Sequence, residues 1–188
     1  MADTGLINPT TQSGLVINGA NAIDDDDDTF ALPIDFAGNE MTFLFGSFNG
    51  TDPPAGSTIN GIEVIVIANE NPSYADMKYD IEIALDGTSG TFSSTGDTQD
   101  ITTTKTTYTF GANNDLWGLS WSGWTDLSDL AVRIKQDNVS GGSGSHSSQL
   151  YELRAKVYYT EPAAADQGNG KMLITSGKLT LSSGKILL

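Results

Sequence analysis

The sequence predicts an all-β chain, an antiparallel jelly-roll-like β-sandwich followed by a short repetitive β tail. Three observations support this prediction. Short runs of β-branched and aromatic residues recur between turns rich in Gly, Asn and Asp. No stretch shows the apolar period of about 3.6 residues that is typical of a helix. The last nineteen residues repeat the pair Gly-Lys with a period of seven.

The first half of the sandwich is expected to begin with two aromatic-rich strands, over residues 30–36 and 41–45. The run 57–68 (STINGIEVIVIA) is the clearest strand of the chain. It is apolar at successive positions after Gly61, which indicates a central strand covered on both faces.

The second half is expected to contain four further strands. Residues 77–86 alternate cleanly between apolar and charged side chains and end in the turn signal Asp86-Gly87. A Thr-rich, β-branched strand is predicted over residues 102–110, and an apolar one over 130–134. Residues 150–160 (LYELRAKVYYT) alternate again. Short strands at fairly even spacing indicate a sandwich or a barrel.

Composition divides the chain into four segments. Residues 1–22 are polar and Gly-rich and are expected to form an N-terminal arm, and residues 23–160 form the jelly-roll sandwich. Residues 161–169 (EPAAADQGN) are a linker by composition, and residues 170–188 are the tail.

The tail reads GKMLITS, GKLTLSS and GKILL. A coiled coil does not fit, because Gly would recur in every heptad and the apolar residues alternate by two. We expect three five-residue strands joined by Ser-Gly turns. Such a sheet buries too little surface to stand alone, so it is either a hazard or an assembly element that meets another copy or another protein. Its regularity favours assembly, through the apolar residues Met172, Ile174, Leu179, Leu181, Ile186 and Leu188.

Charge and composition exclude several classes of function. The chain carries 24 acidic and 9 basic residues, a formal charge of -15, which argues against binding nucleic acid. Cysteine is absent, so disulfides and thiolate metal sites are not expected. The N-terminus lacks the features of a secretory signal, and no run approaches the roughly 20 apolar residues that span a bilayer. We expect a protein made in a cytoplasm, with no membrane partner.

No catalytic residue is predicted, and the chain is not expected to be an enzyme. The single histidine, His146, lies in the Gly/Ser-rich sequence GSGSHSS, where a solvated loop residue is expected. Asp80 and Glu82 lie two apart on one strand and are the best candidates for a glycosidase pair. They faintly resemble the Glu-x-Asp-x-Glu strand of jelly-roll glucanases, but the first acid of that motif is Lys78 here. A solvated sheet face is the favoured interpretation.

The sequence leaves two binding hypotheses open, a calcium site and a glycan-binding platform. The unbroken acidic run from residue 24 to residue 28 offers Asp24, Asp26 and Asp28 as calcium ligands, although its spacing matches no EF-hand; no other cofactor is expected. Trp121 and Trp124, flanked by Ser and Gly, either form an aromatic platform for a glycan or pack in the protein.

Three segments carry a family resemblance: PAGSTINGIEVIV (54–66), DLWGLSW (115–121), and residues 153–160, which end in VYYT. In this order they resemble the jelly-roll domain of tailed-phage virion structural proteins, over roughly residues 30–160. The resemblance implies a capsid decoration (cement) protein that binds and stabilises the shell, located in the virion. It also implies a homotrimer whose other partner is the major capsid protein or another virion protein. The alternative is a head-fibre, neck or tail component with a carbohydrate-binding jelly roll.

Overall fold

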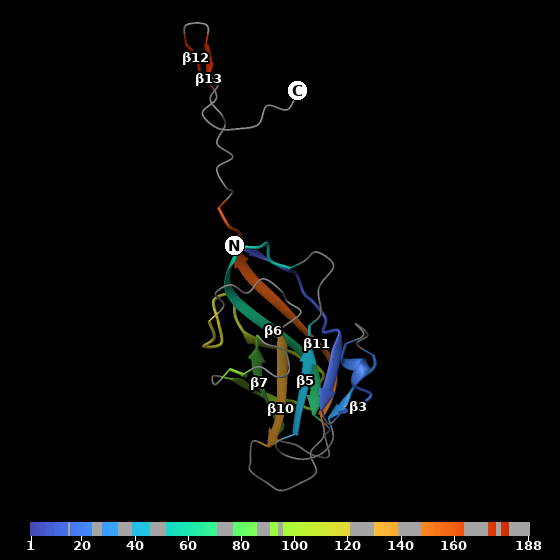
Figure 1. The fold of residues 1–188 in the computed structure, drawn as a ribbon. Helices are drawn as coiled ribbons and strands as arrows, with labels where there is room; N and C mark the ends of the chain where they lie inside the picture. The colour runs from blue at the N-terminus through green and yellow to red at the C-terminus, as the bar shows by residue number, and fades with distance from the viewer. Residues whose placement is uncertain are drawn as a thin grey trace.

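The computed structural model describes residues 1–14, 16–23, 28–33, 39–45, 52–70, 77–85, 91–93, 96–120, 130–138, 148–163, 173–175 and 178–180. Two antiparallel sheets form a sandwich (Figure 1). This arrangement confirms the predicted all-β, jelly-roll-like class. Within the described residues, no helix is long and apolar enough to cross a membrane.

Within the described residues, nine strands make the two large sheets. The four-stranded sheet has the order β1 (Ala2–Asp3), β11 (Ser148–Thr160), β6 (Thr58–Glu70), β9 (Thr106–Gly111). The five-stranded sheet has the order β2 (Thr11–Gly14), β5 (Asn39–Leu44), β10 (Ala131–Asn138), β7 (Met77–Ala84), β8 (Asp97–Ile101). Small antiparallel pairs join β3 (Val16–Ile17) to β4 (Leu32–Pro33) and β12 (Leu173–Thr175) to β13 (Lys178–Thr180), and a 3-10 turn covers Gly19–Ala22.

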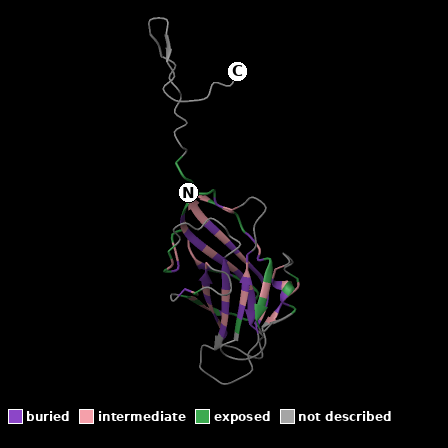
Figure 2. Cartoon of the chain, viewed as in Figure 1, coloured by how far each residue is buried: buried purple, intermediate pink, exposed green. Residues whose placement is uncertain are grey.

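The core lies between the inner faces of the two sheets, where alternate residues of each strand meet. Buried and half-buried positions therefore alternate along the long strands (Figure 2). Strand β6 follows this rule. Its inward Val64 and Val66 are fully buried, whereas Ile65 and Ile67 on the outer face are only partly buried. The expectation that this strand is covered on both faces is correct for its inner face only.

The Thr-rich region differs from the expected single strand over residues 102–110. Two strands, β8 and β9, are present, and a turn stabilised by side-chain hydrogen bonds from Thr102 and Thr106 to the carbonyl of Thr104 connects them. Strand β8 lies at the edge of its sheet, and of its residues only Ile101 is buried. An edge strand with one buried residue lacks the apolar pattern by which strands are recognised.

The first 22 residues contribute to both sheets instead of lying apart from them. Ala2 pairs with Tyr159 of β11, and β2 pairs with β5. Between these strands, Ile7 is buried and forms an isolated bridge to Ala155. The segment expected as an arm thus covers the outer edges of β11 and β5, which reduces the exposed strand edge of each sheet.

Candidate functional site

The three segments that carry the family resemblance meet at one place in the sandwich. The Ile62 amide of β6 donates to the Asp115 carbonyl at 3.0 Å, and Trp117 donates its indole N–H to the Ile62 carbonyl at 3.0 Å. The closing segment lies on the other side of β6, where Tyr158 pairs with Gly61. These contacts stabilise the fold, so the shared residues have a structural role at this junction.

Gly61 is required at this junction by the close approach of the 112–114 backbone. A Cβ at Gly61 would lie 2.4 Å from the Ala112 carbonyl oxygen and 2.5 Å from the Asn113 carbonyl carbon. The Trp117 ring is 2 % exposed. Packing is therefore the role of Trp117.

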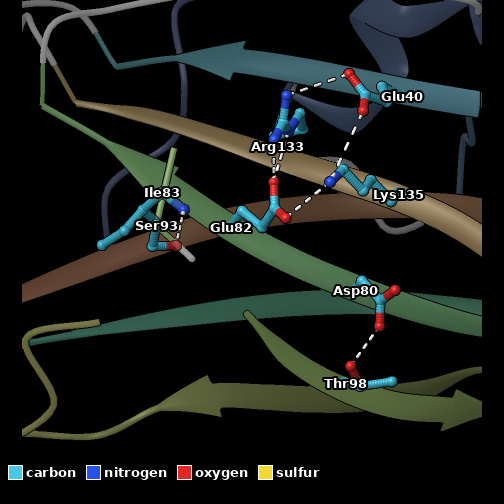
Figure 3. Close-up of polar contacts among 8 residues, drawn as sticks. All are labelled: Glu40, Asp80, Glu82, Ile83, Ser93, Thr98, Arg133 and Lys135. Atoms are coloured by element: carbon cyan, nitrogen blue, oxygen red, sulfur yellow. Dashed lines mark hydrogen bonds and ion pairs between the residues drawn. The ribbon is translucent and has the colours of Figure 1, made fainter. Parts of the chain in front are cut away.

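Charged side chains form a network on the outer face of the five-stranded sheet (Figure 3). The register places Arg133 of β10 opposite Glu82 of β7, and Lys135 between Glu40 of β5 and Asp80 of β7. Lys135 on the central strand therefore lies between acids on both neighbouring strands. Opposite charges in such cross-strand positions stabilise a sheet.

Glu82 is the most strongly held member of this network. Its Oε2 accepts from Arg133 Nε at 2.7 Å, and its Oε1 accepts from Lys135 Nζ at 2.8 Å. Glu40 makes longer contacts, 3.3 Å to Arg133 Nη1 and 3.8 Å to Lys135 Nζ. The Arg133 guanidinium also lies 4.0 Å above the centre of the Phe92 ring, a favourable cation–π position.

The pKa of Glu82 is lowered by this arrangement. Partial burial acts to raise that pKa, but the hydrogen bonds from Lys135 and Arg133 together outweigh the burial. This shift is opposite to the raised pKa that is typical of the general acid of a glycosidase. Asp80 lies on the same face, as expected, and accepts a hydrogen bond from the Thr98 hydroxyl. The geometry favours a sheet-stabilising network over a catalytic pair.

Replacing Glu82 with Gln should lower the free energy of unfolding by about 1–2 kcal/mol at pH 7, because two half-buried cations lose their closest partner. A carboxyl whose pKa is lowered on folding stabilises the fold above its unfolded pKa, and this contribution disappears as the pH falls through the folded pKa. The difference between wild type and variant should therefore be constant above about pH 5 and shrink in more acidic solution. Urea unfolding between pH 3 and pH 8 measures it.

The matched control is Glu40→Gln, since Glu40 contacts the same two cations but its side chain is 45 % exposed. We expect a cost of at most about 0.5 kcal/mol for it. Equal costs for the two variants would contradict the assignment of Glu82 as the centre of the network.

A second polar group lies inside the sandwich. The Tyr79 hydroxyl donates to Ser148, whose hydroxyl donates to Gln136 Oε1 at 2.8 Å. Burial raises the pKa of Tyr79 well above its usual value. The hydroxyl stays protonated, and the chain of hydrogen bonds satisfies three polar side chains that the core encloses.

The binding hypotheses fall mostly outside the described residues. Trp121, Trp124, Asp24 and Asp26 all lie there, so the glycan platform and the calcium site stay predictions. Asp28 is described and is exposed in a turn. Within the described residues, no group of three or more His, Cys, Asp or Glu side chains could hold a metal ion.

The tail is described at two of its three repeats. Strands β12 and β13 form an antiparallel pair in which Ile174 lies opposite Leu179. These two predicted assembly residues share one face, and Leu173, Thr175, Lys178 and Thr180 share the other. The strands are three residues long, shorter than the predicted five. The other predicted assembly residues lie outside the described part: Met172, Leu181, Ile186 and Leu188.

The network residues Glu40, Arg133 and Lys135 were not predicted from the sequence. Their strands are far apart in the chain, since Glu40 and Arg133 are 93 positions apart. The alternation of 77–86 places Glu82 on the outer face, but only the strand order shows which charges oppose it.

Searches against family models and curated proteins found no match. Similar solved structures include a truncated AlyQ with CBM32 and alginate lyase domains, at 18 % identity and TM-score 0.47, covering 86 % of this chain and 35 % of that one. The C-terminal domain of a chitobiase from Bacteroides fragilis has 11 % identity and TM-score 0.48, covering 83 % and 99 %. A structure of infectious bursal disease virus, Gt strain, has 15 % identity and TM-score 0.42, covering 80 % and 32 %.

This chain thus spans about a third of the AlyQ protein and of the viral chain. Identities below 20 % and these TM-scores carry no conclusion about activity or ligand. The assignment of this chain as a jelly-roll-like β-sandwich rests on its own strand order, with four and five antiparallel strands in two facing sheets.

Proposed function

We propose that this protein is a non-enzymatic structural subunit of a virion, and in the narrowest form a capsid decoration protein. In this proposal the sandwich is the folded body, and the tail attaches it to neighbouring subunits or to the major capsid protein. The resemblance of three segments to tailed-phage virion proteins supports the class, and their convergence around Gly61 and Trp117 supports the shared scaffold.

The observation that carries the proposal is the β12–β13 hairpin. Within the described part of the chain, it shares no strand pairing with either large sheet. An isolated two-stranded hairpin is marginal in water at best, and three residues per strand are fewer than usual. Its apolar face, which carries Ile174 and Leu179, gains stability only when another surface covers it.

We expect the double substitution Ile174→Ser, Leu179→Ser to convert an oligomeric protein into a monomer, because both changes remove apolar area from the face that docks. Leu173→Ser is the matched control, since Leu173 lies on the opposite face of the same strand. Sedimentation velocity of the full chains measures the effect. A wild type that is monomeric at every concentration, or a control as disruptive as the double variant, would sink the proposal.

The alternative, a fibre, neck or tail component with a carbohydrate-binding jelly roll, depends on Trp121 and Trp124 alone. Trp117 does not support it, because its ring is buried and its indole N–H is bonded to Ile62. We therefore favour the decoration protein.

A further inference from the structure

Charge is divided unevenly between the body of the chain and its tail. Residues 170–188 contain three of the nine basic residues, Lys171, Lys178 and Lys185, and none of the 24 acidic ones. Residues 1–169 therefore hold six bases against 24 acids. A basic, partly apolar tail thus follows a strongly acidic sandwich.

Five of the six bases of the body lie on strands of the two sheets, and Lys105 lies in the turn between β8 and β9. Together they leave the acidity of the body largely unbalanced. Arg133 and Lys135 are bound to Glu82, and Arg154 forms an ion pair with Glu152. Exposed acidic residues occur at the start of the chain, on the edge strand β8 and after β11, namely Asp3, Asp100 and Glu161.

Within the hairpin, the apolar residues Ile174 and Leu179 and the basic residue Lys178 lie on different faces. Ile174 and Leu179 share one face, and Lys178 lies on the other beside Thr175. An interface at this hairpin therefore combines apolar contact with a lysine charge. Apolar contact at the centre with charges at the rim is the usual anatomy of a protein interface.

Charge also decides which occupant covers the hairpin. Tails of several copies packed against one another would bring together three lysines per chain with no acid to neutralise them. Nucleic acid would attract the tail, but the acidic body of the same chain would repel it. An acidic protein surface attracts the lysines, and residues 1–169 of another copy, with 24 acids and six bases, provide such a surface.

We propose that the tail of one copy docks on the acidic sandwich of a second copy. This inference rests on the proposed function, because it names the occupant of the attachment tail. A head-to-tail contact of this kind joins two different surfaces and closes into a ring when the rotation between copies permits it. A trimer is one such ring.

Reversing the three lysine charges tests the inference in the full-length protein. The variant Lys171→Glu, Lys178→Glu, Lys185→Glu should assemble at least about 100-fold more weakly than wild type, since three attractions become repulsions. The matched control Lys171→Arg, Lys178→Arg, Lys185→Arg keeps the charge and should assemble as wild type does. Wild-type assembly should also weaken as salt rises from about 0.05 M to 1 M. Sedimentation velocity measures all three proteins.

Carbodiimide cross-linking identifies the docking surface. An equal mixture of ordinary and 15N-labelled protein is expected to give amide links from tail lysines to Asp or Glu of residues 1–169 that join a light and a heavy copy. Links confined to single copies would overturn the inference, as would a Glu variant that assembles like wild type. A wild type that never assembles would instead refute the proposed function itself. Equal urea unfolding of all variants confirms that the sandwich remains intact.

Discussion

Replacing Gly111 with Ala is expected to lower the free energy of unfolding by about 3 kcal/mol or more. Gly111 ends β9 with φ at +71°, where a Cβ is strained. The added Cβ would lie 2.4 Å from the Ile62 carbonyl oxygen and 2.8 Å from Cζ2 of the Trp117 ring. The methyl group would clash with both the backbone of Ile62 and the buried Trp117 ring, so β9 must shift to admit it.

Gly5→Ala separates the two causes of this cost. Gly5 has φ at +72°, almost the same as Gly111, but nothing lies within 4 Å of its added Cβ. The control therefore carries the conformational strain alone, about 1–2 kcal/mol. Urea unfolding of both variants gives the comparison. Similar losses would show that β9 moves away freely and that the junction is less tightly packed than its distances indicate.

The strands of this protein could be predicted where burial on one face imposes a local pattern. The alternation of Tyr79, Ile81 and Ile83 indicates which face of β7 points inward, and all three are fully buried. Each residue carries this information itself, since successive side chains of a strand point to opposite faces. Strand β8 has a single buried residue and gives no such signal.

The charged network could not be predicted because it depends on which strands are neighbours. Glu82 and Arg133 are 51 positions apart in the sequence, and Glu40 is farther still from Arg133. Their meeting is set by the order β5-β10-β7 and by the register within it. Local alternation fixes the face of a side chain, but pairing across the sheet is a property of the whole fold.

The resemblance to virion proteins predicted the fold better than it predicted a site. Asp115 and Trp117 belong to one of the shared segments, and the Trp117 amide donates to Asp115 Oδ1 at 2.7 Å. Trp117 has φ at 56°, a left-handed conformation that a non-glycine residue adopts only when its surroundings hold it. Residues that hold such a conformation are constrained by the fold. Their sequence pattern therefore identifies the fold but not the function that the fold serves.

Trp117→Ala is expected to cost about 3–5 kcal/mol, because it leaves a cavity where a fully buried ring packs against the core. Trp117→Phe keeps most of the ring but cannot donate to the Ile62 carbonyl, so about 1–2 kcal/mol is expected. Both variants keep a Cβ at a left-handed position, and the strain at this residue therefore cancels in the comparison. Urea unfolding of the two proteins measures the ring and the hydrogen bond separately.

Combining Trp117→Ala with Gly111→Ala tests whether the junction acts as one packed unit. Removing the ring eliminates the 2.8 Å contact with the new methyl group, while the 2.4 Å contact with the Ile62 carbonyl remains. Gly111→Ala should therefore cost about 1 kcal/mol less in the Trp117→Ala variant than in wild type, without becoming neutral. Strictly additive costs would contradict this prediction. They would mean that the added methyl group does not contact the Trp117 ring in the Gly111→Ala variant, because β9 has moved away from the ring.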